Sequence, residues 1–125
     1  GTATTFNVEN SKGCFIGGVI APGFRLMTDS LADRTAQLPR ISVDGNIPAV
    51  GRNTVEAMRI GAVIGYRVLV REMTAHLIKQ NNLGRIKLVA TGGLAETVFK
   101  GLDLPYHLDP KLTLKGLYRI FELNG

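Results

Sequence analysis

The chain has 125 residues, of which 45% are apolar and 20% charged, and this is the balance of one soluble globular domain with a single core. Its most apolar stretch, residues 58–70, is interrupted by Arg59 and Arg67, which excludes a membrane-spanning segment. The net charge of +5 favours anionic ligands such as nucleotides or phosphorylated metabolites. The basic residues are scattered as on a solvated surface, which argues against nucleic acid as a partner.

The first 39 residues predict a hairpin followed by a helix. Residues 3–9 and 14–21 are rich in Thr, Phe, Val and Ile, and turn residues (ENSKG) connect them. Phe24, Met27 and Leu31 then recur at helical spacing before Pro39. The single cysteine, Cys14, cannot form an internal disulfide, so we expect a structural thiol and a reducing compartment, the cytoplasm.

A long helix is expected in the middle of the chain. Residues 39–51 predict a loop with a short extended piece around residues 41–43. Asn53 with Glu56 then forms a capping box that starts a helix over Thr54–Gln80. One apolar face of this helix is traced by Val55, Met58, Ala62, Tyr66, Leu69, Met73 and Leu77.

Two glycines, Gly61 and Gly65, lie four residues apart inside this helix, where each costs up to ~1 kcal/mol relative to alanine. Close approach of another helix, within the chain or at a subunit interface, would explain them. A bend in the helix is the alternative.

The last 40 residues predict short strands that alternate with helices. Residues 86–90 form an apolar strand, residues 94–100 a short helix stopped by Gly101, and residues 106–108 a second strand. Residues 112–123 predict a final helix that buries Leu114, Leu117, Phe121 and Ile120.

Two segments contain residues suited to a nucleotide. GTATT (residues 1–5) combines a glycine, which allows close approach of a ligand, with hydroxyl and amide groups that can face a phosphate. ATGG (residues 90–93) lies between the predicted strand and helix, where glycines can approach a purine or ribose and the helix amino end favours negative charge. Each segment has a structural alternative, a strand entrance for the first and tight helix-on-sheet packing for the second.

The order of these elements resembles the second domain of the actin-like ATPase superfamily, which has a ribonuclease H-like α/β fold with a mixed sheet and flanking helices. Further motifs, taken in order, resemble the second half of type III pantothenate kinases: GGVIAPG (17–23), RTAQLP (34–39), VGRNT (50–54), VATGG (89–93) and DPKLTLKGL (109–117). The resemblance runs nearly end to end. It implies that residues 1–125 are the carboxy-terminal domain, in part, of a two-domain kinase.

The resemblance also implies an activity and its site. The family phosphorylates pantothenate with ATP, as a homodimer, with Mg2+ and a monovalent cation (K+ or NH4+). Gly1 and Thr2 resemble its ATP-phosphate contacts, and Gly92 and Gly93 its adenosine contacts. Thr54 resembles the threonine that reaches pantothenate bound by the neighbouring subunit, although helix capping beside Asn53 is an alternative.

Part of the family machinery is expected outside this sequence. The family's catalytic base is an aspartate of a GADR motif, its other domain carries D-x-G-N, and a further aspartate of D-x-G-T-A-T-T helps hold the monovalent cation; none of these stands in this sequence. We therefore expect an amino-terminal half, covalent or separate, that includes the first strand of this domain, and no activity from the 125-residue chain alone.

One position departs from the family pattern, because Asn7 stands where many relatives have Asp, which predicts weaker metal affinity if that position arranges metal. Two other functions stay open. One is a noncatalytic transcription accessory factor that keeps the kinase fold, and the other is a sugar-type kinase.

Overall fold

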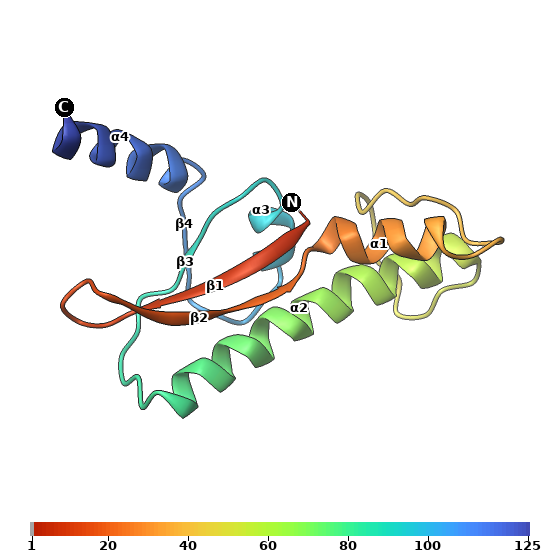
Figure 1. Ribbon diagram of the computed structural model, residues 1–125. Helices are drawn as coiled ribbons and strands as arrows, with labels where there is room; N and C mark the ends of the chain where they lie inside the picture. Colours follow the sequence, from red (N-terminus) through yellow and green to blue (C-terminus); the bar gives the residue numbers. More distant parts are fainter. Residues whose placement is uncertain (1) are drawn as a thin grey trace. The chain divides into compact units, whose positions relative to one another are not determined.

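The computed structural model of the chain describes residues 2–125 (Figure 1). Across these residues the elements follow the order β1, β2, α1, α2, β3, α3, β4, α4, so the protein is of mixed α/β class. The chain divides into two compact units, Gly1–Val70 and Arg71–Gly125, and the boundary falls inside α2. Within residues 2–125, none of the helices combines the length and apolar character needed to cross a membrane.

The first unit opens with the predicted hairpin. β1 (Ala3–Glu9) and β2 (Phe15–Pro22) pair antiparallel, with Ala3 opposite Pro22. The turn between them is stabilised by Asn10, whose Oδ1 accepts the backbone N–H groups of Lys12 at 2.9 Å and Cys14 at 3.0 Å. The hairpin is therefore confirmed, and Cys14 is an exposed free thiol at its turn.

The hairpin has one packed face and one open face. Thr4, Phe6 and Val8 alternate as the half-buried residues of β1, and the Thr4 hydroxyl shares a hydrogen bond with the Tyr66 hydroxyl of α2. On β2, a Cβ at Gly18 would lie 2.0 Å from the carbonyl oxygen of Phe6, so the strands approach at a distance that glycine alone allows.

The first helix, α1 (Phe24–Asp33), follows the hairpin directly, as predicted. Phe24 is buried and meets the ring of Tyr66 edge to face, with the ring centroids 5.2 Å apart. Thr28, also buried, satisfies its hydroxyl with the carbonyl oxygens of Phe24 and Arg25 one turn earlier. Phe24 and Tyr66 thus form the centre of the core of the first unit.

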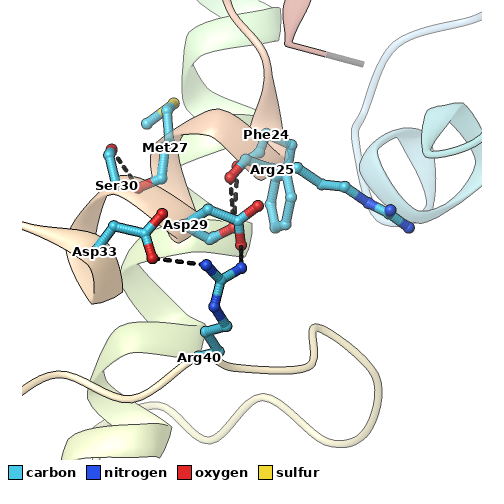
Figure 2. A network of polar contacts seen from close by, with 8 residues as sticks. Phe24, Arg25, Met27, Asp29, Ser30, Asp33 and Arg40 are labelled. Carbon is cyan, nitrogen blue, oxygen red and sulfur yellow. Dashed lines mark hydrogen bonds and ion pairs between the residues drawn. The ribbon is translucent and has the colours of Figure 1, made fainter.

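The segment between α1 and α2 contains neither helix nor strand, so the extended piece predicted around residues 41–43 is wrong. Side chains hold this loop in place of strand pairing. The Arg40 guanidinium binds the carboxylates of Asp29 at 3.6 Å and Asp33 at 2.6 Å, both on α1 (Figure 2). Arg59 of α2 donates from Nε to the carbonyl oxygen of Ser42 at 3.0 Å.

The long helix α2 (Thr54–Gln80) has the predicted bounds. Asn53 accepts the N–H of Glu56 at 2.9 Å, and the Glu56 carboxylate accepts the N–H of Arg52 at 2.8 Å, so the capping box closes one residue earlier than expected. The predicted apolar face is right in part, because Met58 and Tyr66 are buried whereas Val55 is exposed. The buried residues that the periodicity missed are Val63, Val70 and Thr74.

The second unit contains a small parallel pair of strands, β3 (Val89–Ala90) and β4 (His107–Leu108). β3 is shorter than the predicted strand over residues 86–90. Between them lies α3 (Ala95–Phe99), which Gly101 follows with φ +88°. The rings of Phe99 and Tyr106 pack with centroids 4.6 Å apart and hold the return to β4.

The final helix, α4 (Leu112–Asn124), forms where predicted but does not bury its apolar side chains. Every residue of α4 is exposed, and the prediction that Leu114, Leu117, Phe121 and Ile120 are buried is therefore wrong for this chain. The physical reason is that, within its own unit, residues 71–125, nothing covers the apolar face of α4.

Candidate functional site

The chain enters β1 through the GTATT segment. Gly1 lies outside the described residues, so its predicted role has no structural description. Thr2 is exposed, and its carbonyl oxygen accepts the N–H of Gly23 at 2.8 Å, which fixes the start of β1 against the end of β2. The Thr2 hydroxyl makes no hydrogen bond to another residue of the described range 2–125, and the residue is exposed.

The open face of the hairpin carries a short polar row next to this entrance. Thr5 and Asn7 are exposed there, opposite Ile20 and Gly18 of β2. A hydroxyl and an amide along one strand offer hydrogen-bond donors and neutral oxygen acceptors. The departure at Asn7 therefore lies on an accessible surface and not in the packed face.

The ATGG segment forms the turn between β3 and α3. Gly92 has φ +101°, a conformation that L side chains rarely adopt, and its carbonyl oxygen accepts the N–H of Ala95 at 3.1 Å. A Cβ built on Gly92 or on Gly93 would meet no atom within 4 Å. Tight helix-on-sheet packing therefore does not account for these glycines within residues 2–125, and the space beside them is open to a ligand.

The helix after this turn contributes less than the sequence suggested. α3 has five residues, which is little more than one turn, so few peptide dipoles align behind its amino end. The expected attraction of negative charge by that helix is small. Any nucleotide contact at ATGG would depend on the glycine backbone itself.

The VGRNT segment places Thr54 at the first position of α2. A Cβ at Gly51 would lie 2.5 Å from the backbone nitrogen of Ala57, so glycine is needed where the loop crosses the first helical turn. Asn53 caps the helix, while Thr54 is exposed and its hydroxyl makes no hydrogen bond within residues 2–125. The capping alternative therefore applies to Asn53, and Thr54 keeps a free hydroxyl on a well-fixed backbone.

Asp109, which was not among the predicted site residues, makes several of the polar contacts in the second unit. Asp109 follows β4 and is 13% exposed; its carboxylate accepts the N–H of Lys111 at 3.1 Å and the Nζ of Lys115 at 2.7 Å. The hydrogen bond from Lys115 lowers the pKa of Asp109, with the Lys111 N–H adding to the effect against partial desolvation. Its own N–H binds the carbonyl oxygen of Ala90 at 2.9 Å.

Asp109 therefore connects the start of α4 to β3, the strand that leads into ATGG. The sequence signal was available in the motif DPKLTLKGL, where an aspartate precedes Pro110 at the start of a helix and Lys115 stands one turn in.

The predicted residues lie in both units. Thr2 and Thr54 belong to the first unit and Gly92 and Gly93 to the second, so the two-segment clamp on a nucleotide stays a prediction. Among residues 2–125, no three His, Cys, Asp or Glu side chains are grouped so that they could hold a metal ion.

Comparison with known proteins decides the family. A sequence profile for type III pantothenate kinases matches residues 1–76. The chain belongs to the type III pantothenate kinase family. Curated type III pantothenate kinases match nearly all of it: that of Akkermansia muciniphila is 47% identical over 99% of this chain, and that of Koribacter versatilis 42% identical over 99%.

A more distant type III pantothenate kinase, from Persephonella marina, is 37% identical over 100% of this chain. These matches cover 51%, 45% and 49% of the three relatives, so the chain spans about half the length of the curated relatives it matches.

A solved structure supports the fold. The crystal structure of a Campylobacter jejuni protein described as a Baf family transcriptional activator superposes with a TM-score of 0.66, covering 98% of this chain and 54% of that one. The two sequences are 21% identical, so this likeness is evidence for a shared fold alone.

Proposed function

We propose that this chain is the carboxy-terminal half of a two-domain pantothenate kinase, which uses ATP to make 4'-phosphopantothenate in the first step of coenzyme A synthesis. The observation that carries this proposal is the match to type III pantothenate kinases over 99–100% of the chain at 37–47% identity. The likeness is therefore not confined to a single glycine-rich motif.

The reaction assigns different tasks to the two halves. The primary hydroxyl oxygen of pantothenate forms a bond to the γ-phosphorus of ATP, the bond from that phosphorus to the β–γ bridging oxygen breaks, and the hydroxyl proton passes to a base. We assign the base to the other half, as the GADR aspartate. This half binds and orients the two substrates.

For ATP, we assign the phosphates to Gly1 and Thr2 and the adenosine to Gly92 and Gly93. The free hydroxyl of Thr2 and its fixed backbone support the first contact. The open space beside Gly92 and Gly93 supports the second, since a purine or ribose needs a backbone that it can approach closely.

For pantothenate, we assign Thr54 to the pocket of a second subunit in a homodimer. The exposed side of α2 supports such a contact. Gly61 and Gly65 would meet no atom within 4 Å if given a Cβ, and Ile64 and Val68, on the same side of the helix, are exposed. A helix face of glycines beside apolar residues suits close packing against a second helix.

We propose that the complete domain has the ribonuclease H-like fold of the actin-like ATPases, with its first strand in the other half, before Gly1. Two observations support this. The likeness to the Campylobacter jejuni structure extends over nearly the whole chain. Within residues 2–125 the strands form two separate sheets of two strands each, and β1 pairs with β2 alone, which leaves an edge for a further strand.

The family's cations, Mg2+ and K+ or NH4+, do not fit this half by itself, since residues 2–125 offer no cluster of acidic or His side chains for a metal. We place their main ligands in the other half and derive no step through them. We also place the enzyme in the cytoplasm, where its substrates ATP and pantothenate would meet.

The proposal is tested with the complete gene product. ADP release is measured with pantothenate or a panel of sugars as acceptor, in the presence of Mg2+ and either K+ or NH4+. We expect ADP release with pantothenate as the acceptor and none with any of the sugars. Turnover with a sugar alone, or salt-dependent DNA binding without turnover, would overturn the proposal.

A further inference from the structure

The strongest unexplained feature is the outer face of α4. Leu114, Leu117, Tyr118 and Phe121 follow the spacing i, i+3, i+4, i+7, which places them on one side of the helix; we call them the α4 stripe. They are 65%, 59%, 64% and 72% exposed. On the adjoining side of the helix, Lys115 pairs with Asp109, and Arg119 pairs with Glu122. The helix is amphipathic, with its apolar side uncovered.

Such a face is costly to leave in water. Burying a single Leu or Phe side chain contributes ~1.5–3 kcal/mol, so four such side chains are a large fraction of the stability of a domain. Continuous exposed apolar surface of this kind marks a site of contact.

We infer that the α4 stripe docks on the amino-terminal half of the full-length protein, an inference that rests on the proposed function. The matches to the relatives extend over 99–100% of this chain, so α4 belongs to the shared part. About half of each relative lies outside the matched part, and that remainder is a covering partner of domain size on the same polypeptide.

A second copy of the chain fits this face less well. The four side chains of the α4 stripe offer roughly 500–600 Å² per partner, short of the ~800 Å² per partner of a standard interface. Docking within one polypeptide loses no further translational freedom, so the same area suffices.

The docked helix would link the other half to the proposed nucleotide site. Asp109 fixes the first turn of α4 through Lys111 and Lys115, and its N–H holds Ala90, the last residue of β3. The glycine turn follows that strand. Movement of the other half would therefore reach Gly92 and Gly93 through α4 and Asp109.

Two consecutive positions, one on the stripe and one on the adjoining charged side of α4, test the inference in the complete protein. Phe121→Cys introduces a thiol on the stripe and Glu122→Cys one on the charged side, each in a Cys14→Ser background. The rate of maleimide alkylation at each position is followed by peptide mass spectrometry, without substrate. We expect the thiol at position 121 to react at least 10-fold more slowly than that at 122, with the difference abolished in urea. Equal rates in the native protein would overturn the inference.

The covering partner is identified by attaching a benzophenone maleimide at position 121 under mild denaturation, refolding and irradiating. We expect cross-links to residues outside this chain. Cross-links within residues 2–70, or to a second copy detected by mixed isotope labelling, would overturn the inference. If dilution of the protein made alkylation at position 121 fast, the cover would be a second copy that dissociates, and the inference would be overturned.

The proposed function can fail separately. If the stripe is covered but the protein does not phosphorylate pantothenate, the proposed function is wrong and the docking inference stands. If the protein phosphorylates pantothenate but the stripe is exposed, the docking inference is wrong and the proposed function stands.

Discussion

The helices α2 and α4 look alike in sequence but differ in what covers them. Both were predicted as amphipathic helices from apolar residues at helical spacing. α2 buries Met58, Val63, Tyr66 and Val70, whereas α4 buries none of its residues. Periodicity therefore shows which side of a helix is apolar, but not whether the residues that cover this side lie in the same stretch of chain.

The largest expected effect is at the centre of the covered helix. Tyr66→Ala removes the ring packed on Phe24 and the hydroxyl bonded to Thr4, and should lower the free energy of unfolding by about 3–5 kcal/mol. Phe121→Ala in the 125-residue chain should change it by less than ~0.5 kcal/mol, since that ring is exposed. Urea unfolding of the 125-residue chain measures the free energy of unfolding of both variants. Equal losses would show that α4 is already covered within this chain, and the contrast between α2 and α4 would be wrong.

A smaller effect is expected where the loop crosses the first turn of α2. Gly51→Ala places a Cβ 2.5 Å from the nitrogen of Ala57 and should destabilise by about 1–3 kcal/mol. Gly84→Ala is the control, since its Cβ would meet no atom within 4 Å. Thermal unfolding of both variants in the complete protein checks the difference. A neutral Gly51→Ala would mean that the start of α2, and with it Thr54, is not fixed as described.

The long helix α2 also has an uncovered face, which carries Gly61 and Gly65. Gly61→Ala and Gly65→Ala should each raise the stability of the 125-residue chain by up to ~1 kcal/mol through helix propensity. In the complete protein the same changes should weaken the proposed homodimer, because the added methyl groups would separate the two helices. Thermal unfolding and sedimentation velocity distinguish the two effects. An unaffected dimer would exclude this face as the subunit interface.

The smallest effect concerns the start of α4. The folded pKa of Asp109 lies below its ordinary value of 3.8 because Lys115 donates to the carboxylate. The ionised Asp109 therefore stabilises the folded state at pH values above 3.8, and this stabilisation is lost as the pH falls through the folded pKa. A carboxyl NMR titration should show the pKa of Asp109 rising toward 3.8 in Lys115→Gln. An unchanged pKa would mean that Lys115 does not hold the first turn of α4.

Much of the fold followed from local patterns. The hairpin, the start of α2 at Asn53 and the turn at Gly92 all depend on residues close together in the chain, and all were predicted. The extended piece at residues 41–43 was wrong because Arg40 and Arg59 hold that loop through side chains, at sequence separations that periodicity does not report.

The candidate site was predictable to a different degree. Thr2 and Thr54 lie beside backbone hydrogen bonds at the start of β1 and of α2, and their contacts with ATP and pantothenate stay predictions. Asp109 was missed although its motif was visible, because the bond from its N–H to Ala90 joins segments that are distant in the chain. What covers α4 could not be predicted at all, since a helix pattern carries no information on its partner.

The most direct test of the whole account is complementation between two variants of the complete protein. Thr2→Val should raise the KM for ATP and Thr54→Val the KM for pantothenate, each by about 10-fold, the value of one hydrogen bond. In a mixed dimer carrying one variant in each subunit, one of the two sites keeps both threonines if Thr54 acts across the interface. With both substrates held far below their KM values, we predict that the purified mixed dimer reaches about half of the wild-type rate, against about a tenth for either single variant. A mixed dimer as impaired as the single variants would contradict the account.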